Sequence, residues 1–257
     1  MVSTVHIVMQ GKGGAGKSLT SSMLVQYFQH ANYLVQAIDL DPTTPTLSAI
    51  KALRAVPIQI MDGDDINPRL FDHVMTRIFE APDDSHTVID TGTSAFIATC
   101  SYLAENNAFE LLQEAGVRVY IHCPVCGGAV LDDTFNSLLA IFRHFPGVPL
   151  VVWLNEFFGT ITKNGMSFEE SNICLDNADR IAAVMSHPKV QAGTFGEDIR
   201  AMMAAKLTFE EAIRSNDFNV MARQRLKIYW TKAIERLDGV AFVEPVDLGT
   251  SDQEAAE

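Results

Sequence analysis

The chain has few cysteines and few basic residues. Of its 257 residues four are cysteine, and 19 lysines and arginines stand against 32 aspartates and glutamates, giving a formal net charge of −13. Four cysteines are too few for a disulfide scaffold, so we expect reduced thiols and a cytoplasmic protein. The acidic balance excludes a chain that coats nucleic acid or an anionic membrane with its whole surface, but it leaves room for a local basic patch.

Long hydrophobic runs are missing as well. The longest stretch without a charged residue lies between Lys17 and Asp39, and it contains polar residues such as Ser21 and Gln26. Such residues are costly in hydrocarbon, so we do not expect a membrane span. The first ten residues have no basic start and run into a glycine loop, which is not typical of a cleavable signal. With 47% hydrophobic and 20% charged residues, the composition is that of a globular protein.

Short apolar runs alternate with helical patterns along the chain. These runs are rich in valine and isoleucine, as strands buried on both faces of a parallel sheet require. The predicted strands are Val5–Met9, Leu34–Ile38, Pro57–Ile60, Thr87–Ile89, Val117–Ile121 and Leu150–Leu154. The alternation predicts an α/β fold with a doubly wound, mostly parallel sheet flanked by helices. Because we find no linker, we predict one domain over 1–246 and an acidic, disordered tail over 247–257.

The strongest motif is a glycine-rich loop. Residues 10–18 read Gln-Gly-Lys-Gly-Gly-Ala-Gly-Lys-Ser, and they follow the first predicted strand and open the first predicted helix. They match G-x-x-x-x-G-K-[ST] in the strand-loop-helix context of a phosphate-binding loop. Backbone N–H groups of such a loop surround an anion, and the helix N-terminus adds positive potential. The predicted nucleotide-binding residues are Gly11, Gly13, Gly14, Ala15, Gly16, Lys17, Ser18 and Leu19.

This motif assigns two further roles. Lys17 is expected to reach the β- and γ-phosphates, and the Ser18 hydroxyl to ligate Mg²⁺. Aspartates that end other predicted strands should meet the loop, because the carboxyl ends of parallel strands share one edge of a sheet. Asp90 is expected to hold Mg²⁺ through water, with Asp39 beside the magnesium shell, and residues 92–94 to sense the γ-phosphate. Asp41 is expected to be an acceptor near the γ-phosphate.

Lys12 makes the loop more specific. The form K-G-G-x-G-K-[ST] resembles the deviant Walker A loop of the ParA/MinD group of ATPases, in which the early lysine crosses a dimer interface to the partner's nucleotide. The resemblance implies ATP and Mg²⁺ as cofactors, a homodimer formed on ATP binding, and Lys12, Lys17 and Asp41 as catalytic residues. Asp41 matches the group's switch I aspartate, which positions the attacking water.

The same resemblance bears on the choice of base. Asn155 ends a predicted strand where this group uses an asparagine for adenine, and a T-K-x-D guanine motif is absent there. We therefore expect ATP rather than GTP. Pro188 and Lys189 are candidates for part of the adenine wall.

Segments along most of the chain resemble the TraL family of plasmid conjugal-transfer ATPases. They are Gln10–Ser18, Ile38–Pro42, Ile60–Asp72, Val88–Phe96, Phe109–Gly116, Val151–Gly159, Leu207–Ile213 and Ala222–Ile228. The resemblance implies a slow, partner-stimulated ATPase that acts as a dimerisation switch in conjugal transfer or plasmid maintenance, with a protein of that process as partner. Thr43 departs from the glutamine that ParA partition ATPases usually have after Asp-Pro. The alternatives are a nucleotide-gated recruitment module with negligible turnover, or a metabolite kinase or ATP-dependent ligase.

Two further features have competing interpretations. Cys123 and Cys126 form a Cys-x-x-Cys pair, which can be a redox pair or half a metal site, but buried structural thiols are favoured. A predicted last helix, Phe218–Leu237, has basic residues along both flanks of an apolar face. It can be a packed core helix or contact DNA or lipid; we favour the core helix, because the acidic tail would repel an anionic surface.

Overall fold

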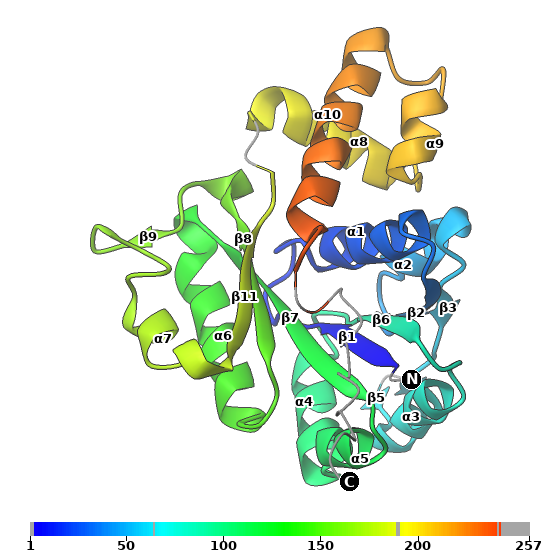
Figure 1. The fold of residues 1–257 in the computed structure, drawn as a ribbon, viewed down its shortest axis with the longest axis vertical. Helices are drawn as coiled ribbons and strands as arrows, with labels where there is room; N and C mark the ends of the chain where they lie inside the picture. Colours follow the sequence, from blue (N-terminus) through cyan, green and yellow to red (C-terminus); the bar gives the residue numbers. More distant parts are fainter. Residues whose placement is uncertain (1–2, 64, 189–190, 241, 243–257) are drawn as a thin grey trace, which may run out of the picture.

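The centre of the molecule is a seven-stranded, wholly parallel sheet (Figure 1). The computed structural model describes residues 3–63, 65–188, 191–240 and 242, so the predicted tail over 247–257 lies outside the described residues. The strand order is β11-β8-β7-β1-β6-β2-β3. The strands are β1 (Thr4–Val8), β2 (Leu34–Asp39), β3 (Val56–Pro57), β6 (Ser85–Asp90), β7 (Arg118–Cys126), β8 (Leu150–Asn155) and β11 (Ile181–Ser186). The predicted doubly wound α/β class is confirmed.

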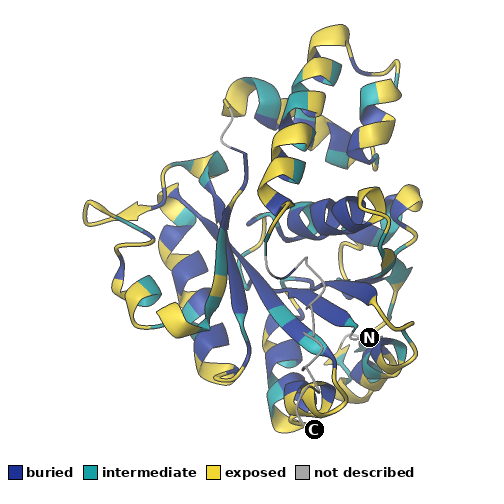
Figure 2. Cartoon of the chain, in the orientation of Figure 1, coloured by how far each residue is buried: buried dark blue, intermediate teal, exposed yellow. Residues whose placement is uncertain are grey.

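Helices cover both faces of this sheet, and the central strands between them are buried (Figure 2). One layer contains α3 (Asp72–Phe79), α4 (Phe96–Glu105), α5 (Ala108–Glu114) and α6 (Leu131–His144). The other contains α1 (Lys17–His30), α2 (Thr46–Ala49), α8 (Glu197–Ala204), α9 (Phe209–Arg214) and α10 (Val220–Leu237). A short helix, α7 (Asn172–Leu175), precedes β11. Helices α8, α9 and α10 form a lobe beyond α1, at the top of Figure 1, which we call the helical lobe.

The sheet differs from its prediction at both edges. The strand expected at Pro57–Ile60 exists but has other bounds, because β3 spans Val56–Pro57 and ends three residues earlier than predicted. Ile60 is fully buried, so its apolar side chain serves the core without belonging to a strand. Strand β11 at the other edge was not predicted, because its side chains mix buried, half-buried and exposed positions, a weak apolar signal. After β11 the described chain contains only helical elements and their connections, so strand and helix do not alternate to the end.

Two short antiparallel hairpins lie outside the central sheet. In the first, β4 (Met61–Asp62) pairs with β5 (Asp65–Ile66), and in the second β9 (Thr162–Lys163) pairs with β10 (Met166–Ser167). The second turn is Asn164-Gly165, with φ of 53° and 81°. Asn-Gly with two positive φ angles is the preferred two-residue hairpin turn, so the sequence did contain this signal.

The long stretch without charged residues is explained by α1, which is buried between the sheet and the helical lobe. Its polar side chains have partners there: the Ser21 hydroxyl donates to Asp90 Oδ1 at 2.9 Å, and Gln26 Oε1 accepts from the backbone N–H of Phe209 at 2.8 Å. Such pairing is what makes buried polar groups tolerable. No helix in the described part of the chain is both long and apolar enough to cross a membrane.

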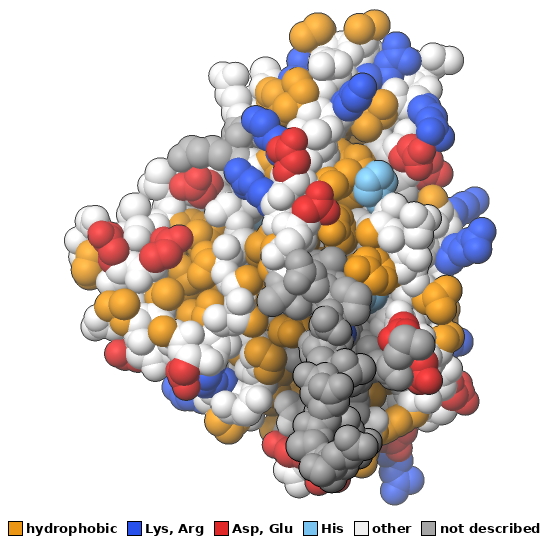
Figure 3. Space-filling view, viewed as in Figure 1, with side chains coloured by type: hydrophobic (Ala, Val, Ile, Leu, Met, Phe, Trp, Pro, Cys, Tyr) orange, Lys and Arg blue, Asp and Glu red, His pale blue; other side chains and the backbone are white. Residues whose placement is uncertain are grey.

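Helix α10 begins after Asn219, whose side chain accepts from the backbone N–H of Ala222 at 2.9 Å. Its apolar face is buried, at Ala222, Leu226, Tyr229, Ala233 and Leu237. Lysine and arginine side chains gather over the helical lobe (Figure 3). Four basic side chains of α8, α9 and α10 have partners within the chain: Arg225 pairs with Asp198, Arg200 with Glu197 and Arg214 with Glu210, and Arg236 donates to the carbonyl of Ser186. This packing supports the core-helix interpretation.

A row of buried histidines crosses the sheet on the α1 side. The indole N–H of Trp153 donates to His122 Nδ1 at 2.9 Å, His122 Nε2 lies 3.0 Å from His6 Nδ1, and His6 Nε2 lies 3.0 Å from His86 Nδ1. Because indole can only donate, His122 must carry its proton on Nε2, and the same logic fixes His6 in that tautomer. Burial lowers the pKa of His122 to about 3 and of His86 to about 4, and it lowers the pKa of His6 well below its ordinary value.

This row should make the fold acid-sensitive. The unfolded chain binds protons on these histidines near pH 6.5 and the folded chain does not, so stability is lost as pH falls from about 6.5 towards 4. Each histidine contributes up to about 1.4 kcal/mol per pH unit. His86→Gln should flatten the decline in the free energy of urea unfolding over this range, and the exposed His73→Gln serves as control. Equal slopes in the two variants would contradict the assignment.

Candidate functional site

The glycine loop leaves β1 at the carboxyl edge of the sheet and leads into α1. Gly14 and Gly16 have φ of 75° and 103°, a region that side chains with a Cβ rarely adopt. Gly13 and Gly14 are exposed, and a Cβ on Gly14 would meet nothing within 4 Å, so the rim of the loop is open. Lys17, the first residue of α1, is buried.

A buried amide anchors the start of the loop. Gln10 Oε1 accepts from the backbone N–H of Lys12 at 3.1 Å, and Gln10 Nε2 donates to the carbonyls of Pro124 at 2.7 Å and Thr134 at 3.3 Å. The side chain is fully buried, so these bonds face no competition from water. Gln10 therefore ties the loop to β7 and to α6.

The carbonyl of Ala15 is held by side chains from β7 and β8. It accepts from the Cys126 thiol at 3.2 Å and from Asn155 Nδ2 at 3.1 Å. Asn155 Oδ1 accepts from the backbone N–H of Phe157 at 3.1 Å, capping the short turn Glu156–Phe158. The structure thus brings Asn155 to the loop, but both ends of its amide already have partners within the chain. Its adenine contact stays a prediction.

The Cys-x-x-Cys pair lies inside β7. The predicted strand Val117–Ile121 would have ended before the pair. Residues three apart in a strand point to opposite faces and are separated by about 10 Å, so Cys123 and Cys126 cannot form a disulfide here. Both are fully buried, and burial raises the pKa of the Cys126 thiol to about 12. Among the described residues, no group of three or more His, Cys, Asp or Glu could hold a metal ion. Cys126 acts as a donor to the loop.

Lys17 faces the segment predicted to sense the γ-phosphate. Its Nζ donates to Thr93 Oγ1 at 2.8 Å. Burial lowers the pKa of Lys17, while the nearby carboxylates of Asp90 and Asp41 act in the opposite direction. The two predicted aspartates and the loop lysine therefore share one site.

Asp90 is the most perturbed acid in the site. Burial raises the pKa of this carboxyl to about 7, although hydrogen bonds from Ser18 and Ser21 act to lower it. Its Oδ2 atom is buried and has no hydrogen-bond partner within the described chain. A buried carboxylate oxygen without a partner beside a serine hydroxyl fits a hydrated divalent cation, which prefers oxygen ligands. The two metal-site predictions Ser18 and Asp90 therefore lie together.

Asp39, the third predicted metal-site residue, supports the loop after β2. Its Oδ1 accepts from the backbone N–H of Asp41 at 3.1 Å and its Oδ2 from that of Ser48 at 2.8 Å. Asp39 pairs with Asp90 across β2 and β6, so it lies next to the site. In this structure its carboxylate orders the backbone around Asp41.

Asp41 is oriented by the residue that departs from the ParA pattern. Its Oδ1 accepts from the Thr43 hydroxyl at 2.8 Å and from the backbone N–H groups of Thr43 and Thr44 at 2.9 Å each. A Cβ on Gly92 would lie 2.8 Å from this oxygen, so only glycine fits there. The Asp41 segment and the segment 92–94 are therefore in direct contact.

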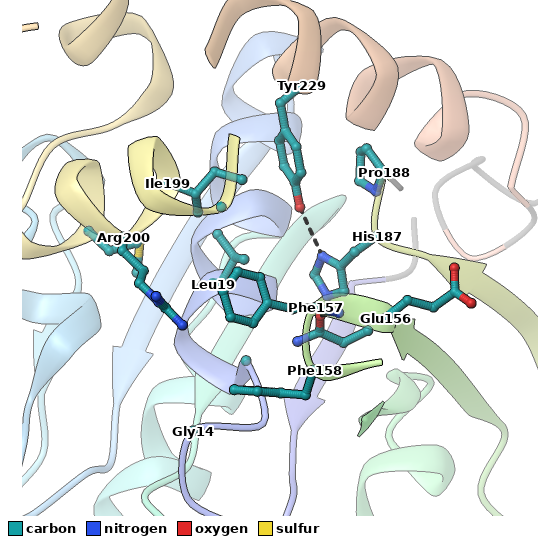
Figure 4. Close-up of a pocket in the computed structure, with 14 residues that line it drawn as sticks. Gly14, Leu19, Glu156, Phe157, Phe158, His187, Pro188, Ile199, Arg200 and Tyr229 are labelled. Carbon is teal, nitrogen blue, oxygen red and sulfur yellow. Dashed lines mark hydrogen bonds between the residues drawn. The ribbon is translucent and has the colours of Figure 1, made fainter. Parts of the chain in front are cut away.

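A pocket of about 330 Å³ opens beside the loop (Figure 4). Its lining is mostly apolar and includes Gly14, Gly16, Leu19, Asn155, Glu156, Phe157, Phe158, His187, Pro188, Gly196, Ile199, Arg200, Met203 and Tyr229. His187 lies between two elements: its Nε2 is 3.1 Å from Thr20 Oγ1 and its Nδ1 is 3.3 Å from the Tyr229 hydroxyl. The Arg200 guanidinium lies over the Phe157 ring, 4.4 Å from its centroid.

Of these lining residues, sequence reasoning predicted Gly14, Gly16, Leu19, Asn155 and Pro188 as nucleotide contacts and missed the others; Lys189 lies outside the described residues. His187 follows β11 at the same sheet edge as the loop. It would have been found had β11 been predicted, because the strand-end rule then applies. The lobe residues have no local motif.

Comparison with known proteins agrees with this geometry. A family model described as the CobQ/CobB/MinD/ParA nucleotide binding domain matches residues 6–233. Two proteins named TraL from Escherichia coli are 37% and 36% identical over 243 residues, covering 94% of this chain and all of each relative. The chain belongs to the TraL family of this nucleotide-binding group. The predicted family is confirmed.

Solved structures agree on the fold of this TraL-family chain. The MinD cell division protein of Aquifex aeolicus has a TM-score of 0.53 at 13% identity, covering 96% of this chain and 99% of its own. The MinD of Pyrococcus horikoshii, solved with Mg-ADP, has a TM-score of 0.52 at 13% identity, covering 95% and 100%. At this identity the likeness concerns the fold alone.

The buried Asp90 should reduce the stability of the ligand-free TraL-family chain. Its folded pKa is raised above the unfolded value near 3.9, so its charge costs stability increasingly as pH rises from about 4 to 7. Asp90→Asn should therefore raise the free energy of unfolding at pH 8 by up to about 4 kcal/mol, and by less as pH falls towards 4. Chemical denaturation at pH 8 and 5 measures this.

Asp39→Asn is the matched control. It also removes one negative charge from the same edge, but it weakens a carboxylate that accepts two backbone N–H groups, so it should destabilise at both pH values. An Asp90→Asn protein less stable than wild type at pH 8 would contradict the assignment of Asp90 as a buried acid whose negative charge costs stability.

Proposed function

We propose that this TraL-family chain is an ATPase whose ATP-bound form is a homodimer, acting as a switch in plasmid conjugal transfer or plasmid maintenance. One observation carries the proposal: the two lysines of the loop lie in different environments and have different partners. Lys17 is buried against Thr93 inside the site, while Lys12 is half-exposed on its outer rim and bonds to Asp133 of α6. A lysine on the rim is suited to a phosphate presented by a second subunit.

The nucleotide is proposed to be ATP with Mg²⁺. The open loop rim and Lys17 offer donors to phosphates, and the apolar pocket beside the loop offers room for a base against Phe157, Phe158 and Pro188. Ser18 and Asp90 are the residues that would hold Mg²⁺, with Asp39 behind them. The bound ion would neutralise negative charge on the phosphates. The Mg-ADP in the P. horikoshii MinD structure supports this choice.

The proposed reaction is attack of water on the γ-phosphate, which breaks its bond to ADP and releases phosphate. Asp41 would orient this water, and its own orientation comes from Thr43 and Thr44. Lys17 would break its hydrogen bond to Thr93 and bind the phosphates instead. The segment 92–94 would then be released from Lys17 when ATP binds. A slow rate and stimulation by a partner protein are part of the proposal.

The setting of the switch is proposed from the TraL resemblance. We expect it in the cytoplasm, with a conjugation or plasmid-maintenance protein as partner. Direct contact of α10 with DNA or lipid is not favoured, because its apolar face is packed within the molecule. Phosphate release without a phosphorylated product separates the ATPase from a metabolite kinase, and measurable turnover separates it from a pure recruitment module.

Substitutions of Lys17 and Asp41 should affect different steps, the first ATP binding and the second ATP hydrolysis. Lys17→Ala should weaken ATP binding about a hundredfold or more, because charge-assisted bonds to two phosphates are lost. Asp41→Ala should keep the affinity and slow hydrolysis about a hundredfold, because a water-orienting group acts mainly in the transition state. Titration calorimetry and phosphate release measure the two effects. Wild-type turnover in Asp41→Ala would remove Asp41 from the mechanism.

Lys12 should separate binding from dimerisation. Lys12→Ala should bind ATP, because Lys17 and the loop backbone remain, yet fail to dimerise. ATP carries more negative charge than ADP, so the dimer should form only with the triphosphate. Light scattering of Asp41→Ala with ATP or ADP, with and without Lys12→Ala, measures this. An ATP dimer that does not depend on Lys12 would leave an ordinary P-loop enzyme.

A further inference from the structure

Two lysines from different elements are tied to the first turn of α6. Lys12 Nζ of the glycine loop lies 2.7 Å from Asp133 Oδ2, and Lys163 Nζ of β9 lies 2.6 Å from Asp132 Oδ1. Aspartates are favoured in the first turn of a helix, where the peptide dipoles leave positive potential. The adjacent aspartates Asp132 and Asp133 thus bind lysines from two separate elements, β9 and the glycine loop.

The pair between Lys12 and Asp133 is one side of a closed ring of contacts. The backbone N–H of Lys12 is held by Gln10, and the other end of the Gln10 amide donates to the carbonyl of Thr134, next to Asp133. The Ser137 hydroxyl donates to the carbonyl of Asp133 at 3.1 Å. The backbones that carry Lys12 and Asp133 are therefore linked through the Gln10 amide, and the two side chains can separate without breaking that link.

We propose that Asp133 is a positioning residue that holds Lys12 in its own subunit and thereby opposes the ATP dimer. This rests on the proposed function. The Lys12 ammonium must leave Asp133 to reach a phosphate of the partner subunit's nucleotide, so each dimer breaks two such pairs. Their side chains are 37% and 55% exposed, which makes the pair weak enough to exchange.

This competition changes the protein concentration at which the ATP-bound dimer forms. An exposed ion pair changes an equilibrium by up to about fivefold, so two pairs change the dimerisation constant by up to about twenty-five-fold. A triphosphate, with more negative charge than a diphosphate, competes better with Asp133 for the same ammonium. The pair therefore helps to keep the ADP-bound and free forms monomeric.

The experiment measures dimerisation of the full chain by sedimentation over a range of protein concentrations, at saturating ATP and Mg²⁺, in the Asp41→Ala background. Asp133→Asn should dimerise at a three- to twenty-five-fold lower concentration than its parent. Asp132→Asn is the matched control: it removes the same charge from the same turn but releases Lys163, so its dimerisation should equal that of the parent. Asp133→Glu should restore the parent's behaviour, and ATP affinity should be equal in all variants.

The other outcomes contradict either the role of Asp133 or the proposed dimer. Dimerisation of Asp133→Asn that equals that of Asp132→Asn overturns the role of Asp133 and leaves the switch intact. Weaker dimerisation of Asp133→Asn also overturns it, because Asp133 would then attract the second subunit. A parent that stays monomeric with ATP overturns the proposed dimer itself, and the role of Asp133 with it.

Discussion

The carbonyl oxygen of Ala15 is the point on which the phosphate loop depends. A glycine loop has little conformational preference of its own, so its shape must come from neighbours that fix its backbone. Here β7 supplies the Cys126 thiol and β8 supplies the Asn155 amide to that one carbonyl, while Gln10 holds the other end of the loop. With the carbonyl turned towards the strands, the loop's open side is left for N–H groups. The loop is therefore shaped by hydrogen bonds whose two partners lie more than a hundred residues apart in sequence.

Electrostatic strain accompanies this order. Among the described residues, one carboxylate oxygen of Asp90 is buried without a hydrogen-bond partner, and the buried Lys17 ammonium donates to the neutral hydroxyl of Thr93. Both groups are held where their charged forms lose hydration, which raises the pKa of the acid and lowers that of the amine. A ligand that brings a cation to Asp90 and an anion to Lys17 relieves both costs together. Binding energy at this site can therefore come from a destabilised free state as well as from new contacts.

The sequence predicted the site where local rules suffice, and it failed where distant elements meet. Glycine spacing identifies the loop, and the shared edge of parallel strands brings Asp39, Asp41 and Asp90 near it, because both rules need only neighbouring residues. The pocket residues His187 and Tyr229 come from a strand with a weak apolar pattern and from the last helix, so no local motif marks them. The Gln10 and Cys126 contacts were invisible for the same reason, since each is defined by its partner rather than by its sequence neighbours.

Helix α1 connects the site to the rest of the molecule. Its first turn carries Lys17 and Ser18, its next residues bond through His187 to Tyr229 of α10, and Gln26 holds the start of α9. The pocket beside the loop is lined by the same His187 and Tyr229 together with residues of α8 (Figure 4). A molecule that fills this pocket must therefore contact the glycine loop, the sheet edge and the helical lobe at once. The helix that carries Lys17 and Ser18 is thus joined by buried hydrogen bonds to the helical lobe that forms the far wall of the pocket.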